Sequence, residues 1–181
     1  CNAAETSSAD DAEALRALIQ RQLPQIAQRL QWTTDKLNAP QKALIGDGKP
    51  AQEWWDNLRQ RYAAEPVEFK AADITAGATV PAELFDSVAD NLLQNALQKS
   101  KLEPGLRITV AFSAVTLSVC DNGVPLNEAL AKALFIGPVA SQNGLGIGLY
   151  QAARQATQTG YRLRLASNQI GRVCFELAPA N

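Results

Sequence analysis

The sequence predicts an α+β protein with the architecture of a two-layer α/β sandwich. A mixed, mainly antiparallel sheet carries helices on one face, and an α-helical hairpin precedes it. Pairs of alternating runs separated by turn residues predict β-hairpins at 107–120 and 162–177. Patterns with the helical period lie at 81–99 and 144–159. Helices and hairpins that follow one another in this order place the helices against one face of a sheet.

The N-terminal third predicts two helices. Apolar residues recur at spacings of three, four and seven from residue 10 to 37, and Pro24 should kink this helix. A second helix is expected at 51–64, and a loop rich in helix breakers joins the two into an αα-hairpin. Its apolar face consists of Trp54, Trp55, Leu58 and Tyr62. The apolar stripe of the first helix is longer than this one short helix covers, so we expect a weak homodimer through these helices.

The composition shifts after Pro66, where the second domain is expected to begin. The order predicted from there is a strand at 67–70, a turn-rich link at 71–79, a helix at 81–99, the hairpin at 107–120, a helix or loop at 126–134, a glycine-led helix at 144–159 and the hairpin at 162–177. We therefore place the helical hairpin in residues 1–64 and the α/β domain in residues 65–181.

The composition excludes several classes of function. The hydrophobic fraction of 46% is too high for a disordered chain. With 17 basic and 18 acidic residues, the net charge of −1 provides no electrostatic footprint for nucleic acid or an anionic membrane. The chain contains no histidine, which excludes Ser–His–Asp triads, His–Cys zinc sites and a phosphohistidine within these residues. It does not begin with Met, so we interpret it as a fragment or a processed chain.

The chain has three cysteines, and their spacing is not that of a metal site. Cys120 and Cys174 stand inside apolar runs, where a free cysteine behaves as a small buried hydrophobic residue. We therefore expect two separate buried thiols and a reducing compartment.

Two asparagines form the first candidate site. Asn91 and Asn95 are four residues apart in the helix expected at 81–99, so they lie on one helical face. An amide oxygen is a hard neutral ligand that suits Mg²⁺ when phosphate oxygens complete its coordination. Two incidental amides on a helix would look the same, so this pair carries little weight alone.

The second candidate site follows an apolar strand, in the run Asp121-Asn122-Gly123. A carboxylate at the end of the strand could accept a hydrogen bond from an exocyclic amine such as adenine N6, and Gly123 allows a ring to come close. An ordinary Asp-Asn-Gly turn is the alternative.

The third candidate site is a run of alternating glycines, Gly144, Gly146 and Gly148, directly before a helix. Backbone amides that are free of side chains at a helix N-terminus bind phosphate. The spacing is neither that of a dinucleotide fingerprint nor that of a P-loop, and a plain glycine-rich linker is the alternative.

Taken together in this order, the motifs resemble the nucleotide-binding fold shared by gyrase, Hsp90, histidine kinases and MutL. They are most similar to the catalytic domain of sensor histidine kinases. Residues 91–96 resemble its N box, 121–123 its G1 box, 144–149 its G2 box and 134–138 a reduced F box in the lid. The resemblance covers about residues 67–179. Residues 1–64 look like the end of that family's dimerisation and phosphoacceptor domain.

The resemblance implies a two-component signalling enzyme that binds ATP and Mg²⁺. It would transfer the γ-phosphoryl group to a His outside this chain, from which a response regulator would take it. It implies a cytoplasmic domain whose parent protein is anchored in the inner membrane. The implied metal ligands are Asn95 and Asn91, and the implied catalytic residues are Asn95 and Lys99. The implied ATP-binding residues are Asn91, Asn95, Lys99, Asp121, Gly123, Phe135, Ser141, Gly144, Leu145, Gly146, Ile147, Gly148 and Leu149.

The sequence departs from the family pattern at three places. Pro125 replaces the usual second glycine of the G1 box, and Gln98-Lys99 replaces a Lys-Tyr pair at the end of the N box, so Lys99 would reach a phosphate from a shifted position. Members that hydrolyse ATP carry Glu where Asn91 stands, and an amide cannot act as a general base. This favours transfer to an acceptor that is already nucleophilic, such as neutral imidazole, over hydrolysis. The alternative reading is a degenerate, non-catalytic nucleotide-binding and dimerisation module.

Overall fold

The computed structural model describes residues 48–137 and 145–180. The elements are β1 (Lys49–Pro50), α2 (Ala51–Arg61), β2 (Val67–Ala72), β3 (Thr79–Val80), α3 (Ala82–Leu102), β4 (Ile108–Ser113), β5 (Thr116–Asp121), α4 (Glu128–Ala133), α5 (Leu145–Gln158), β6 (Tyr161–Gln169) and β7 (Arg172–Pro179). The first helix of the expected hairpin, at 10–37, lies outside the described residues. No helix among the residues described is both long and apolar enough to cross a membrane.

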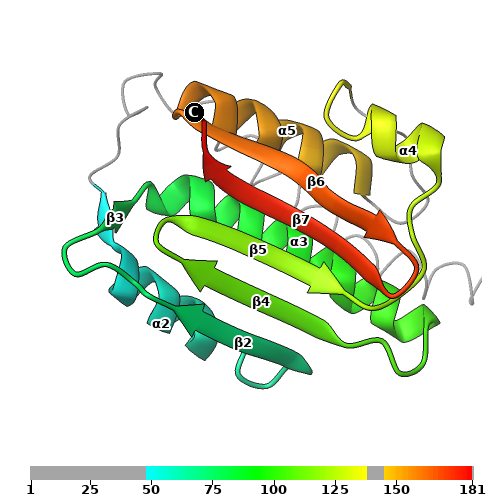
Figure 1. Cartoon of the computed structure of the whole chain (residues 1–181), viewed down its shortest axis with the longest axis horizontal. Helices are drawn as coiled ribbons and strands as arrows, with labels where there is room; N and C mark the ends of the chain where they lie inside the picture. Colours follow the sequence, from blue (N-terminus) through cyan, green and yellow to red (C-terminus); the bar gives the residue numbers. More distant parts are fainter. Residues whose placement is uncertain (1–47, 138–144, 181) are drawn as a thin grey trace, which may run out of the picture. The chain divides into compact units, whose positions relative to one another are not determined.

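Five strands form one mixed sheet in the order β2-β4-β5-β7-β6 (Figure 1). The pair β2/β4 is parallel, and the pairs β4/β5, β5/β7 and β6/β7 are antiparallel. The two hairpins expected from the sequence are β4–β5 and β6–β7, and they meet along β5 and β7. The short strands β1 and β3 form a separate antiparallel pair.

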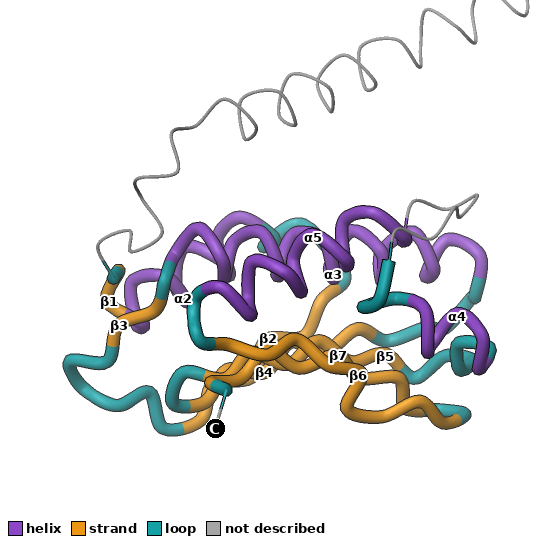
Figure 2. The backbone as a smooth tube through the Cα atoms, turned by 90° about the horizontal axis from the view of Figure 1, so that it is seen from above, coloured by secondary structure: helices purple, strands orange, loops and turns teal. Residues whose placement is uncertain are grey.

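The helices α2, α3 and α5 cover one face of this sheet (Figure 2). The strands alternate accordingly: Ile108, Val110 and Phe112 of β4 are buried against the helices, and the residues between them are only partly buried. The helix α3 contributes the largest set of core residues, including Leu84, Phe85, Val88, Leu92 and Leu93. The two-layer α+β sandwich predicted from the sequence is confirmed.

An aromatic cluster fastens α2 to the sheet. Trp54 meets Phe85 edge to face, with ring centroids 5.1 Å apart, and Trp55 stacks on Phe112 at 5.6 Å. Trp54, Trp55 and Leu58 are at most 2% exposed and belong to the same core as the sheet. The apolar face of α2 therefore packs on the α/β core. A helical period shows that a face is buried, but not which surface buries it.

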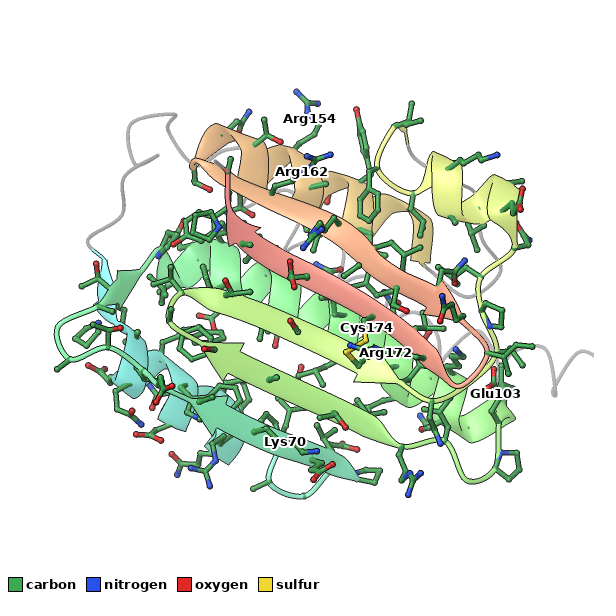
Figure 3. The ribbon with its side chains drawn as sticks, viewed as in Figure 1. Lys70, Glu103, Arg154, Arg162, Arg172 and Cys174 are labelled. Atoms are coloured by element: carbon green, nitrogen blue, oxygen red, sulfur yellow. A yellow bond between two sulfur atoms is a disulfide. The ribbon has the colours of Figure 1, made fainter. Side chains whose placement is uncertain are left out.

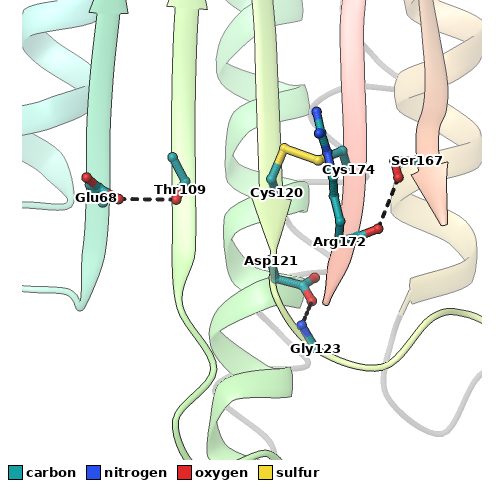
Figure 4. Close-up of a disulfide and its surroundings, with 8 residues drawn as sticks. All are labelled: Glu68, Thr109, Cys120, Asp121, Gly123, Ser167, Arg172 and Cys174. Atoms are coloured by element: carbon teal, nitrogen blue, oxygen red, sulfur yellow. Dashed lines mark hydrogen bonds between the residues drawn. A yellow bond between two sulfur atoms is a disulfide. The ribbon is translucent and has the colours of Figure 1, made fainter. Parts of the chain in front are cut away.

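The structure corrects the interpretation of the cysteines. Cys120 of β5 and Cys174 of β7 are directly opposite one another in the antiparallel register, and they form a disulfide (Figure 4). The expectation of two separate buried thiols is wrong. The argument for a reducing compartment rested on free thiols, so it no longer holds. The residues are 54 positions apart in the sequence, and only the pairing of the two hairpins brings them together.

Candidate functional site

A cavity of about 220 Å³ lies between the C-terminal half of α3, the end of β5 and the strand β7. Its walls are mainly apolar, and its polar side chains come from α3 and from Asp121 at the end of β5. The lining residues are Leu92, Asn95, Ala96, Gln98, Lys99, Leu102, Glu103, Val119, Asp121, Val124, Pro125, Leu126, Val173 and Phe175. The structure thus brings the N-box helix and the G1 turn, which the sequence separates, around one cavity.

Asp121 is held by two donors on the same carboxylate oxygen. Lys99 Nζ lies 2.7 Å from Asp121 Oδ1, and the backbone N–H of Gly123 donates to this oxygen at 2.9 Å. The bond to Gly123 is visible in Figure 4. The side chain of Lys99 is 20% exposed and that of Asp121 is 10% exposed, so water screens this ion pair less than a surface pair. No hydrogen bond to Asp121 Oδ2 occurs among the described residues.

The turn after Asp121 is fixed from the α3 side. Lys99 Nζ also donates to the carbonyl oxygen of Val124 at 2.8 Å, and the Val124 N–H donates to Glu103 Oε2 at 3.2 Å. Glu103, at the C-terminal end of α3, reaches the turn from there (Figure 3). A Cβ at Gly123 would collide with Glu103 Oε2 and would stand 2.7 Å from the Leu106 side chain. A side chain at residue 123 would therefore require the ends of the Glu103 and Leu106 side chains to shift.

The two asparagines occupy different surroundings. Asn95 lines the cavity one turn before Lys99. Asn91 is not among the lining residues: its Nδ2 donates to the Ser87 carbonyl oxygen at 2.7 Å, and its Oδ1 faces Gly148 of α5 so closely that a Cβ there would collide with it. With the amide nitrogen turned back toward the helix, the carbonyl oxygen is the atom presented to α5. An amide oxygen is a hard ligand of the kind that Mg²⁺ takes, but Asn95 lines the cavity while Asn91 presents its oxygen to α5.

The glycine-rich run is described only in part. Gly144 and Ser141 lie outside the described residues, and α5 begins at Leu145. Gly146 and Ile147 belong to the first turn of α5, where free backbone amides are expected. Leu149 is fully buried in the core, so it anchors α5 rather than lining the cavity.

Phe135 does not line the cavity itself, but it packs against a ring that does. It follows α4 and packs against Phe175 with ring centroids 6.4 Å apart, and Phe175 lines the cavity. The segment before α4 is held to the sheet by Asn168 of β6, whose side chain exchanges two hydrogen bonds with the backbone of Leu126, at 2.8 and 2.9 Å. Sequence reasoning missed Asn168, because it read this residue as part of a turn. It also missed Glu103, which its i+4 spacing from Lys99 on α3 could have indicated.

Residues 81–180 match the family model described as histidine kinase-, DNA gyrase B-, and HSP90-like ATPase. No curated protein matches the chain. The catalytic domain of histidine kinase ThkA is similar over 72% of this chain and 95% of its own, with 18% identity and a TM-score of 0.58. The mycobacterial sensor histidine kinase MprB is similar over 71% and 93%, with 20% identity and a TM-score of 0.55.

Two further similar structures cover more of this chain. The cytoplasmic segment of histidine kinase QseC covers 88% of this chain and 93% of its own, with 17% identity and a TM-score of 0.52. ThkA in complex with the response regulator TrrA covers 91% and 50%, with 16% identity and a TM-score of 0.56. At these identities the likeness shows the fold.

Proposed function

The chain belongs to the histidine kinase-, DNA gyrase B- and HSP90-like ATPase family, and from this premise we propose that it binds ATP with Mg²⁺ in the cavity between α3 and β5. The resemblance to a histidine kinase catalytic domain that the sequence indicates is confirmed. The observation that carries the proposal is Asp121: it is nearly buried in an apolar cavity, one carboxylate oxygen is held in place, and the other is left for an exocyclic amine.

The proposed mechanism is phosphoryl transfer from ATP to a His outside this chain. Asn95 and Asn91 would hold Mg²⁺, which neutralises phosphate charge when it is bound. The first-turn amides of α5 would bind the phosphates. Because Asn91 stands where a general base would be needed to activate water, the site suits a neutral imidazole, which needs no base. Lys99 is ion-paired with Asp121, at the end of the cavity where we place the adenine base. A contact of Lys99 with a phosphate would require this ion pair to break, so that contact stays a prediction.

The wider setting is also proposed. A response regulator receiver domain would accept the phosphoryl group, and the complex of ThkA with TrrA supports this class of partner. Residues 1–64 would contribute to a weak homodimer, although α2 itself packs on the sheet core. We place the domain in the cytoplasm, in a parent protein anchored in the inner membrane. The alternative is a non-catalytic nucleotide-binding module. The chain contains no histidine, so a His-bearing segment outside these residues would separate the kinase from this alternative.

Calorimetric titration with ATP and Mg²⁺ tests the binding. Asp121→Asn places an amide, which can present N–H groups, opposite the adenine amine, and losing a charge-assisted hydrogen bond costs about 1.5–3 kcal/mol, or roughly tenfold or more in affinity. Asp56→Asn, on the exposed face of α2, is the matched control and should leave the affinity unchanged. Absence of adenine nucleotide binding to the wild type, or equal affinity for Asp121→Asn, would refute the proposal.

A hydrolysis assay tests the assigned chemistry. We expect negligible ATP turnover by this chain, and slow hydrolysis after Asn91→Glu introduces a base. Steady turnover by the wild type that is abolished by Asn95→Ala would contradict the transfer mechanism. Labelling of a His-bearing segment of the parent protein by γ-labelled ATP would separate the kinase from the non-catalytic alternative.

A further inference from the structure

At the Asp121 end of the cavity a hydrogen-bond donor, Lys99, lies beside an acceptor, the Asp121 carboxylate. Asp121 Oδ1 receives both Lys99 Nζ and the Gly123 N–H, so Oδ2 is the oxygen left to accept a hydrogen bond. A lysine ammonium has three N–H groups, and Lys99 uses two of them, for Asp121 and for the Val124 carbonyl oxygen. Both side chains line the cavity. The carboxylate and the ammonium therefore lie side by side in the wall of the cavity, where a flat ring can contact both.

This pair matches the hydrogen-bonding edge of two kinds of purine. A 6-aminopurine such as adenine can donate its N6–H to Asp121 Oδ2 and accept at N1 from Lys99. A 6-oxopurine such as guanine or hypoxanthine carries acceptor and donor in the reverse order, so with its ring turned over relative to adenine it can accept at O6 from Lys99 and donate its N1–H to Asp121 Oδ2. Without Lys99, the Asp121 carboxylate would face the lone pairs of O6, and neither group would have a hydrogen-bond donor. A site that leaves polar groups unpaired in this way rejects the ligand, here the 6-oxopurine, strongly.

We propose that Lys99 makes this site accept 6-oxopurine nucleotides, GTP and ITP, as well as ATP. This inference rests on the proposed function, because it assigns the Asp121 end of the cavity to the base. It gives Lys99 a role in base recognition in place of the phosphate contact expected from the sequence. The position of the ammonium supports the assignment, since its two hydrogen bonds, to Asp121 and Val124, fix it at the turn after β5.

The remaining walls do not oppose a second purine. The side chains facing the Asp121–Lys99 pair from β5, the following turn and β7 include Val119, Leu126, Val173 and Phe175, which are apolar and contact a ring without reading its edge. The other charged group in the lining is Glu103, which accepts from the Val124 N–H. The amides of Asn95 and Gln98 also line the cavity, and we assign the discrimination between 6-amino and 6-oxo groups to Asp121 and Lys99 because these two side chains are paired at the end of β5.

The test is calorimetric titration of the full chain with ATP, GTP, ITP and UTP, each with Mg²⁺. We expect ATP, GTP and ITP to bind within about tenfold of one another, and UTP to bind more weakly because a pyrimidine fills less of the cavity. Lys99→Met keeps the side-chain length and removes the donor, so it should weaken GTP and ITP at least tenfold more than ATP. Lys99→Gln keeps an N–H donor and should retain part of the GTP binding. Lys101→Met, on the exposed surface of α3, is the control and should leave all four affinities unchanged.

The outcomes separate this inference from the proposed function. If the wild type binds ATP but neither GTP nor ITP, the inference is wrong and the proposed function stands. If no nucleotide binds, both fail. If Lys99→Met binds GTP as tightly as the wild type, Lys99 does not read the base and the inference is wrong. Near-UV circular dichroism verifies that each variant is folded, and the Lys99→Gln series decides the question if Lys99→Met is not.

Discussion

Helix α2 should be indispensable to the fold of the nucleotide-binding domain, although it precedes both the matched family region and the domain boundary expected from the sequence. The perturbation is removal of residues 1–64, and the matched control is removal of residues 1–47, which keeps α2. The described core residues all lie at or after Ala51, so the control chain retains them. The chain that begins at residue 65 loses Trp54, Trp55 and Leu58.

The magnitude follows from the burial of the two tryptophans, which are 1% and 2% exposed. Burying one tryptophan removes about 150–250 Å² from water, which at about 25 cal/mol/Å² is about 4–6 kcal/mol. The pair therefore contributes about 8–12 kcal/mol, or about 5–11 kcal/mol when the unfolded chain already buries part of this surface. The whole net stability of a domain is about 5–15 kcal/mol. Losing α2 thus removes an amount comparable to the total, and it also uncovers Phe112 of the sheet.

Urea unfolding followed by far-UV circular dichroism, which reports on the backbone of both chains, checks this. The chain from residue 48 should unfold cooperatively, with a free energy of unfolding close to that of the full chain. The chain from residue 65 should show no cooperative transition and should bind a hydrophobic dye. A cooperative transition for the chain from residue 65, within about 2 kcal/mol of the control, would refute the reasoning, because α2 would then contribute far less than its buried area implies.

Three other expectations rest on single contacts. A reducing agent should lower the free energy of unfolding by about 2–4 kcal/mol, since the Cys120–Cys174 bond constrains the unfolded chain; Cys120→Ala should abolish this sensitivity, and a wild-type denaturation curve that ignores the reductant would contradict the bond. Burial, and then a neighbouring carboxylate, raise the pKa of Tyr62, so its contribution to stability is complete below about pH 10 and falls as the pH rises further. Tyr62→Phe should flatten the alkaline limb of the stability profile, and identical limbs would argue against this assignment. Gly148→Ala drives a Cβ into Asn91 and should cost about 1–3 kcal/mol, reduced by about 1 kcal/mol of helix propensity; an unchanged melting temperature and ATP affinity would show that Asn91 moves away freely.

Local patterns in the sequence determined the element types and the identity of the family. The alternation at 107–120 and 162–177 depends only on which side of a strand each residue faces, so the two hairpins could be predicted. The helical period likewise allowed α3 and α2 to be predicted. The order of the N-box, G1 and G2 motifs indicated a histidine kinase catalytic domain, because each motif is a short run whose chemistry can be read from neighbouring residues. Asn95, Lys99 and Asp121 could be named as site residues for this reason, and the structure places all three on one cavity.

Contacts between residues far apart in the sequence were decided by the tertiary structure alone. The aromatic face of α2 has the same period whether it covers a partner helix or a sheet, and only the folded core shows that it packs on Phe85 and Phe112. The two cysteines face each other because β5 and β7 pair in one register, which no local pattern specifies. The ion pair of Lys99 with Asp121 spans 22 positions. It exists because the end of α3 packs over the end of β5, which places the ammonium of Lys99 beside the Asp121 carboxylate.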